Sequence, residues 1–461
     1  MSGGVSERVH DPADRTQHII AAWIEANMGG KLVALERQGR WRPAWYGTVR
    51  MPDGDRPIYV RGERSTKGSG FTLEREYTIH RLCEEGGIKV PHLYGFIPEL
   101  PAIVMDRVRG RHDLRHAASD RDRESVRRQL AREMAKMHKL DTAPFIAAGF
   151  HCPASATETT LAFYSHAMNS PRPTNPVPNP RLAFLEQWVS RNTPPARTEP
   201  RFTACDAGQF MYDGPELTAM MDLELGMLGD PMQDLAILRR RTTYEPMGDI
   251  PSLFAMYEEE MGKPLDLDIV YFHTVASATA AVTSTMKMVA AFRDNPSDDV
   301  NLVEMHNWFH NSTKQGFEGI AEVKGYKVPK VSLGEPLSSF AQDPLIAAKA
   351  MIESLGIDTG FDAYRRSTLL QNVAYQQRIA AYGQQVAVRF IDDAAQILGM
   401  RPRDIADADR LMVDFVNQAG PDEDERLFMV LCADILRRCL MLAIEGSTYY
   451  KGLTEPVQPL Q

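Results

Sequence analysis

The chain has 461 residues, of which 43% are hydrophobic and 25% charged, and its formal net charge is -9. This length exceeds what one compact core usually holds, so it predicts two or three domains. The ordinary composition excludes a wholly disordered or fibrous protein. Because the acidic balance offers no general attraction to a polyphosphate backbone, we do not expect a nucleic acid as a partner.

The cysteines and the N-terminus predict a cytoplasmic protein. The five cysteines are widely spaced and form neither a Cys-x-x-Cys pair nor a zinc pattern, which indicates reduced thiols. The first residues are polar and contain no apolar segment of a signal peptide. No uninterrupted apolar run approaches the roughly 20 residues that span a bilayer. We therefore expect no membrane partner.

The first hundred residues predict strands around one or two helices. A helix over 16–28 ends at a Gly-Gly pair, and β-like runs at 32–35 and 58–61 flank a turn-rich region. Thr72 begins a second helix that ends at another Gly-Gly pair. Two further apolar runs follow, and the second, 102–108, is expected to be a strand.

The middle of the chain mixes helices with one hairpin. A strongly amphipathic helix is predicted over 126–140, and the Pro- and Asn-rich passage 170–180 is expected to be an ordered excursion or lid. The apolar runs 202–211 and 217–223 are joined by a turn that contains Asp-Gly, which predicts a β-hairpin.

The remainder is predicted to be helical. Helices are expected from residue 231 to about 325, a linker over 324–338, and long amphipathic helices at 369–398 and 427–444. We expect three domains, with residues 1–105 as the first, 106–328 as the second and 340–461 as a helical C-terminal domain.

Two aspartates at opposite ends of the predicted hairpin point to chemistry. The hairpin brings Asp206 and Asp222 toward one edge, where one carboxylate can orient a hydroxyl while the other holds a divalent cation. Phosphoryl transfer needs this arrangement. Turns also favour aspartate for conformational reasons, and this preference alone is sufficient to explain an isolated cluster of aspartates. Asp230 and Asp234 are expected to be structural, bracing the loop or capping the next helix.

Several short motifs occur in an order that resembles the aminoglycoside phosphotransferase and choline kinase-like superfamily. The similar segments are Thr72-Leu73-Glu74-Arg75-Glu76, Val90-Pro91, 103–110, 131–141 and the run Met221-Asp222-Leu223-Glu224 to Gly229-Asp230-Pro231. Together they extend over roughly residues 20–325. The resemblance implies an α+β, bilobal protein-kinase-like fold with an antiparallel N-lobe sheet plus helix and a mainly helical C-lobe. An additional all-α C-terminal domain would follow it.

The resemblance also implies roles for particular residues. Asp206 would be the catalytic aspartate, Asp222 the principal magnesium ligand, Arg61 the basic residue that faces the phosphates, and Glu76 its partner on the helix. The alternative for Arg61 is that it is an ordinary cation of an edge strand. The alternative for Glu76 is that it pairs with Arg75 or Lys67. The implied cofactors are ATP and Mg2+.

The nucleotide base and the second metal position are assigned in the same way. Backbone groups of Met105, Asp106 and Val108 would face adenine. Gln209 stands where the superfamily has a metal-binding asparagine, and its amide oxygen would lie one methylene further out. His138 is given no chemical role.

Two segments depart from the superfamily pattern. Ala204-Cys205 replaces the His-Gly that usually precedes the catalytic aspartate. The expected phosphate-covering loop contains Arg40, Trp41, Arg42 and Trp45, where small residues are usual. These bulky side chains are expected to touch the nucleotide or a large acyl substrate, to block the site, or to form an amphipathic surface loop.

The expected function is ATP- and Mg-dependent phosphorylation of a hydroxyl group on a small molecule. An alcohol or a hydroxyacyl-CoA is favoured over an aminoglycoside as the acceptor, because residues 206–214 are similar to the catabolic branch of the superfamily. Residues 375–390 are faintly similar to small helical proteins found beside kinases of hydroxyacyl-CoA breakdown. The alternative is an inactive pseudokinase that serves as a nucleotide-binding or protein-interaction module. A homodimer through the C-terminal helices is a further expectation.

Overall fold

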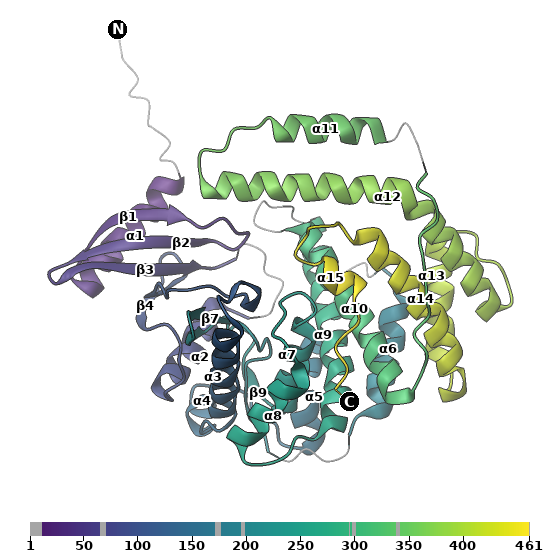
Figure 1. The fold of residues 1–461 in the computed structure, drawn as a ribbon, viewed down its shortest axis with the longest axis horizontal. Helices are drawn as coiled ribbons and strands as arrows, with labels where there is room; N and C mark the ends of the chain where they lie inside the picture. Colours follow the sequence, from purple (N-terminus) through teal and green to yellow (C-terminus); the bar gives the residue numbers. More distant parts are fainter. Residues whose placement is uncertain are drawn as a thin grey trace, which may run out of the picture.

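The computed structural model describes residues 12–64, 71–170, 177–194, 199–294, 296, 301–337 and 342–460. Most of the excursion predicted between Ser170 and Pro180, and the end of the predicted linker at Ser338, lie outside these residues. The remaining elements can be followed in Figure 1.

The N-lobe is a five-stranded antiparallel sheet with the order β1-β2-β3-β5-β4. Its strands are β1 (Lys31–Arg37), β2 (Ala44–Met51), β3 (Gly54–Gly62), β4 (Leu93–Ile97) and β5 (Ala102–Asp106). Helix α1 (Pro12–Met28) packs on one face through Ile20 and Ile24. Strand β2 was not predicted, because its first residues follow Pro43 and were assigned to the phosphate-covering loop.

Helix α2 (Leu73–Glu85) connects β3 to β4 and begins where the sequence predicts. The Thr72 hydroxyl accepts a hydrogen bond from the Arg75 N–H, which satisfies one of the free donors of the first turn. Ile79 and Leu82 turn inward, toward the core of the C-lobe. The same helix carries Glu76, which is 4% exposed and therefore needs a partner inside the protein.

The C-lobe contains two small β-pairs among helices. Strand β6 (Arg201–Thr203) pairs with β9 (Met227–Gly229), and the hairpin of β7 (Phe210–Asp213) and β8 (Glu216–Met220) forms at the predicted turn. The helices are α3 (Asp120–His138), α4 (Ala143–Ala147), α5 (Ala156–Asn169), α6 (Pro180–Asn192), α7 (Met232–Arg241), α8 (Ile250–Met261), α9 (Leu267–Asp294) and α10 (Leu302–Lys324).

Helix α9 forms the centre of the C-lobe. By length and composition it is apolar enough to cross a membrane, but 56% of its most apolar window is buried inside the protein. It packs against α5, α6, α7 and α10. Burial by neighbouring helices therefore accounts for its apolar character.

The C-terminal region is helical and is built on the C-lobe. It consists of α11 (Asp343–Glu353), α12 (Gly360–Leu398), α13 (Ile405–Gln418), α14 (Asp424–Leu442) and α15 (Tyr450–Thr454). One hydrophobic cluster joins Phe390 and Phe428 of this region to Phe184 and Phe317 of the C-lobe. The fold class is confirmed as bilobal and kinase-like with an added helical region, whereas the limits of the three domains stay a prediction.

Helix α12 also reaches the N-lobe (Figure 1). The Arg37 guanidinium at the end of β1 lies 4.7 Å from the centre of the Phe361 ring. A Cβ atom added at Gly39 would lie 2.7 Å from the Gly360 carbonyl oxygen. The loop after β1 is therefore in close contact with the first turn of α12.

Candidate active site

A cavity of about 860 Å3 lies between the two lobes. All the residues to which the sequence assigned a site role line it: Arg61, Glu76, Met105, Asp106, Val108, Asp206, Gln209 and Asp222. They come from β3, α2, the end of β5, and the loops on either side of the β7–β8 hairpin. The fold thus brings together residues that lie up to 161 positions apart.

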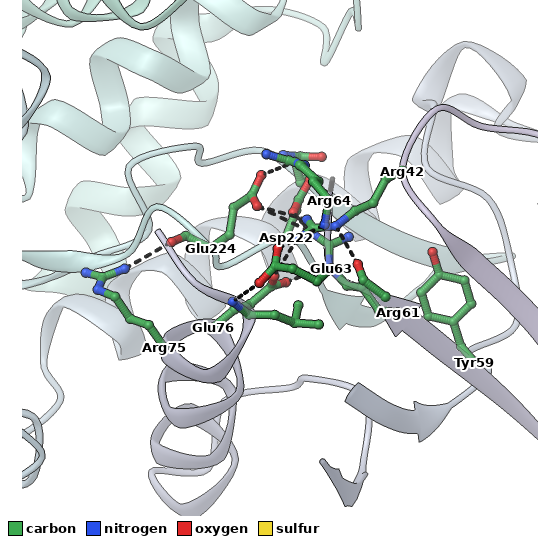
Figure 2. Close-up of polar contacts among 12 residues, drawn as sticks. Arg42, Tyr59, Arg61, Glu63, Arg64, Arg75, Glu76, Asp222 and Glu224 are labelled. Atoms are coloured by element: carbon green, nitrogen blue, oxygen red, sulfur yellow. Dashed lines mark hydrogen bonds and ion pairs between the residues drawn. The ribbon is translucent and has the colours of Figure 1, made fainter. Parts of the chain in front are cut away.

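Arg61 is the centre of an ion-pair network that joins the lobes (Figure 2). Its Nε lies 2.8 Å from a Glu76 carboxylate oxygen, and its Nη2 donates to Asp222. Arg61 and Glu76 are nearly fully buried. The predicted pairing of Arg61 with Glu76 is therefore present, and the alternative with Arg75 is not. Arg75 instead donates to the Glu224 and Gly226 carbonyl oxygens, and Lys67 lies outside the described residues.

Three further residues of this network had no predicted ion-pair partner, although Arg42 was named in the bulky loop and Glu224 in the resembling motif. Arg42 contacts Glu224 at 2.8 Å and Glu76 at 3.4 Å, and Arg64 contacts Glu224 at 2.6 Å. Glu224 had a usable signal, since it stands two positions after Asp222. Arg42 and Arg64 had no such signal, because they lie in loops, and the sequence of a loop does not show where its side chains point.

The network balances three arginines against three carboxylates. Burial of such groups costs free energy that only close pairing offsets. Burial acts to raise the pKa of Asp222, but the charges of Arg61 and Arg42 prevail and the pKa is lowered. Asp222 is therefore an anion, ready to bind a cation or to be held by Arg61.

Asp206 has a different environment. Its Oδ1 accepts a hydrogen bond from Arg241 Nη1 at 2.7 Å, and its Oδ2 accepts one from the Gln209 amide. Burial raises the pKa of Asp206 to about 6, opposed by the charge of Arg241. Asp206 and Asp222 thus have different pKa values within one cavity. This difference is typical of two carboxylates with separate roles, one as a proton acceptor and the other as a metal ligand.

The loop that carries Asp206 is braced from below by Asp234. This fully buried carboxylate accepts hydrogen bonds from the Ala204 N–H at 2.7 Å and the Cys205 N–H at 2.9 Å. His138 Nε2 lies 3.1 Å from Asp234 Oδ2, and its Nδ1 lies 2.7 Å from the Tyr257 hydroxyl. Asp234 therefore has the structural role predicted for it.

Two residues beside the site have left-handed backbone. Cys205 has φ 57° and Asp222 has φ 56°, and they are the only non-glycine residues with positive φ in the described ranges. Such backbone costs about 1–3 kcal/mol per residue and persists only where the surrounding structure imposes it. Cys205 stands where the superfamily has glycine, and its backbone keeps the left-handed conformation that a glycine adopts without strain.

The end of β5 carries the segment expected at adenine. Met105 pairs with Tyr59 across the sheet, and the Asp106 N–H donates to the His92 carbonyl oxygen at 2.9 Å. The Asp106 carboxylate accepts from the Tyr94 hydroxyl. Strand pairing thus uses the Asp106 N–H, while Val108, two positions after the strand, also faces the cavity.

The bulky loop after β1 divides into two parts. Arg40 and Trp41 line the cavity, and the Arg64 guanidinium stacks on the Trp41 ring at 4.4 Å. Trp45 packs on the opposite side of the sheet with Val49 and α1. Arg42, by its ion pairs, holds the loop against the C-lobe. This loop is therefore neither a free surface loop nor uniformly turned to the cavity.

The carboxylates fit Mg2+ better than a metal with an all-protein cage. Among the described residues, no group of three or more His, Cys, Asp or Glu side chains is suited to hold a metal. Mg2+ commonly uses one or two carboxylates and completes its shell with water and phosphate oxygens. Asp222, with one oxygen engaged by Arg61, and the Gln209 amide oxygen are compatible with such binding.

Comparison with known proteins agrees with this geometry. Residues 63–265 match the family described as the phosphotransferase enzyme family. No curated protein matches the chain. Residues 63–265 are therefore similar to this family of phosphotransferases, in agreement with the superfamily that the motifs predicted.

Solved structures of low sequence identity are also similar. Choline kinase LicA from Streptococcus pneumoniae has 14% identity and a TM-score of 0.45, with 67% of this chain and 99% of that chain covered. Aminoglycoside phosphotransferase APH(4)-Ia, in a ternary complex with ADP and hygromycin B, has 12% identity and a TM-score of 0.43, with 64% and 98% covered. Macrolide 2'-phosphotransferase type I has 16% identity and a TM-score of 0.44, with 62% and 98% covered.

Proposed function

We propose that this protein transfers the γ-phosphoryl group of ATP to the hydroxyl group of a small molecule. The observation that carries the proposal is the placement of Asp206 and Asp222 in one cavity, with Arg61 of the opposite lobe paired both with Asp222 and with Glu76. Phosphoryl transfer depends on positioning and electrostatic stabilisation, and these four residues supply both.

Each residue has a role in this proposal. Asp206 orients the acceptor hydroxyl and accepts its proton. Asp222, with Gln209, would hold Mg2+, which would offset the charge of the phosphates. Arg61 exchanges its contact with Asp222 for one with phosphate oxygens, while Glu76 keeps its guanidinium in place. The backbone of Met105, Asp106 and Val108 would face the base, although the Asp106 N–H is engaged with the His92 carbonyl oxygen.

The acceptor is proposed to be an alcohol or a hydroxyacyl-CoA. The experiment is to measure ATP consumption with Mg2+ against a panel of aliphatic, terpenoid and steroidal alcohols, hydroxyacyl-CoA thioesters and aminoglycosides. Turnover that depends on the acceptor and disappears in Asp206→Asn supports the proposal. Absence of turnover with every acceptor contradicts it.

One observation favours the alternative of a nucleotide-binding module without catalysis. Arg61 holds the carboxylate that would bind the metal, and two more arginines, Arg42 and Arg64, lie around the neighbouring Glu224. Nucleotide binding by wild type and Asp206→Asn alike, with no phosphoryl transfer by either, would select this alternative.

A further inference from the structure

The interlobe cavity continues past Asp206 into a second end that the nucleotide roles leave unused. Tyr244, Glu304, Trp308 and Tyr449 line this part of the same cavity. Glu304 and Trp308 belong to α10, while Tyr449 directly precedes α15 in the C-terminal region. These four side chains are called the distal wall below.

A series of contacts joins the distal wall to Asp206. Arg241, which contacts Asp206, has its guanidinium carbon 5.6 Å from the centre of the Tyr244 ring. The Tyr244 and Tyr449 ring centres are 5.5 Å apart. The Tyr449 hydroxyl in turn donates to Glu304 Oε1 at 2.9 Å. The distal wall thus begins at the proposed site of proton transfer and extends away from it.

Hydrogen bonds fix the position of the Glu304 carboxylate. Trp308 Nε1 donates to the Tyr449 hydroxyl at 2.6 Å, so this hydroxyl is free to donate its own proton only onward, to Glu304. The Tyr449 bond uses Oε1 and leaves Oε2 available to another donor. Burial raises the pKa of Glu304, opposed by the Tyr449 hydrogen bond and the charge of Arg40.

Glu304 is only partly buried, so water in the cavity can reach its second carboxylate oxygen. A ligand that displaces this water without supplying a donor leaves the oxygen without hydration and with nothing in exchange. Sites built around such groups discriminate strongly against ligands that lack the matching donor. The adjacent Tyr244, Tyr449 and Trp308 rings offer apolar faces for the carbon skeleton that lies between the two polar ends.

We propose that Glu304, oriented by Tyr449, recognises a second hydrogen-bond donor on the acceptor, remote from the hydroxyl that is phosphorylated. This inference rests on the proposed function and specifies its acceptor as a diol or an amino alcohol rather than a monohydric alcohol. It also makes the C-terminal helical region part of the active site, because that region supplies Tyr449.

The test uses matched acceptors and matched variants of the full-length chain. The acceptors are monohydric alcohols, diols and amino alcohols on the same cyclohexane, linear and steroid skeletons. The variants are Glu304→Gln and Tyr449→Phe, with Glu445→Gln and Tyr450→Phe as controls, since both control residues are exposed. Thermal unfolding shows whether each variant is folded. If Glu304→Gln is not folded, Tyr449→Phe still tests the inference, because it removes only the hydroxyl and keeps the packed ring.

We expect wild type to favour a diol or amino alcohol over the monohydric analogue by about tenfold to a hundredfold in kcat/KM, as for a hydrogen bond to a charged group. Glu304→Gln and Tyr449→Phe should reduce this preference at least tenfold by raising acceptor KM, with the KM for ATP unchanged. A larger loss with amino alcohols in Glu304→Gln identifies an ammonium donor, and an equal loss identifies a hydroxyl.

Four results would overturn the inference. Wild-type turnover with no preference between diols, amino alcohols and monohydric alcohols contradicts the inference alone, as does an unchanged preference in both variants. A loss in the variants that is equal for all acceptors and includes the KM for ATP indicates a structural role. No turnover by wild type with any acceptor removes the proposed function and this inference with it.

Discussion

Substitution of Asp234 by asparagine removes a single oxygen from beneath the loop that carries Asp206. Asp234 Oδ2 accepts from the Ala204 N–H and lies beside His138 Nε2, while Oδ1 accepts from the Cys205 N–H. An asparagine presents one oxygen and one NH2 group. Whichever way its amide is turned, the NH2 group faces a backbone N–H, and one buried donor is left without a partner.

The structure gives the size of the effect. A buried N–H without a partner costs about 1–3 kcal/mol, and loss of the carboxylate's charge weakens the remaining bond, so the free energy of unfolding should fall by about 2–4 kcal/mol. The loop would also shift under Asp206, and a displacement of about 1 Å in a catalytic group reduces kcat by about a hundredfold. Arg61 and Asp222 are unaffected, so the KM for ATP should change little.

Urea denaturation and steady-state kinetics measure the two effects. Asp268→Asn is the matched control, because Asp268 is exposed in the first turn of α9; it should leave kcat unchanged and lower the free energy of unfolding by no more than about 1 kcal/mol. Wild-type stability together with wild-type kcat in Asp234→Asn would refute the bracing role. A loss of ATP affinity equal to the loss of kcat would place its effect elsewhere.

Three further predictions concern the cavity and its support. Arg61→Met leaves the buried Glu76 short of its closest partner and should reduce the free energy of unfolding by about 3–5 kcal/mol in chemical denaturation, whereas Arg61→Lys should lose less. Since Asp206 must be ionised to accept a proton and its pKa is raised to about 6, kcat/KM should be constant above that pH and fall about tenfold per unit below it; a profile still flat at pH 5 would contradict the assignment. Gly110 has φ 110°, and an added Cβ would lie 2.0 Å from the Tyr212 carbonyl oxygen, so Gly110→Ala should lower the melting temperature by several degrees, with a wild-type value counting against the close approach.

Local patterns were sufficient to predict much of the site. The Thr72 hydroxyl caps α2 by accepting from the Arg75 N–H, and the Asp213-Gly214 turn closes the hairpin, so the positions of Glu76, Asp206 and Asp222 follow from short segments. The order of the motifs then relates these segments to one another. Their meeting in one cavity is a consequence of the superfamily fold, which the motif order had indicated.

Contacts between distant segments were not predictable in this way. Arg42 binds Glu224 over a separation of 182 residues, and nothing in the loop around Arg42 specifies that partner. Tyr449 follows a long helix whose apolar stripe indicates packing alone. Its hydrogen bond to Glu304, 145 residues earlier in the chain, depends on how the C-terminal helices sit against α10.

Phosphoryl transfer by wild type and by Asp206→Asn, measured under identical conditions with ATP, Mg2+ and the acceptor panel, decides whether Asp206 is catalytic. We expect a phosphorylated acceptor with wild type and a loss of at least about a hundredfold in kcat with Asp206→Asn, at unchanged KM for ATP. Equal rates for the two proteins would contradict the assignment of Asp206. An ATP-binding wild type that phosphorylates no acceptor would contradict the account as a whole.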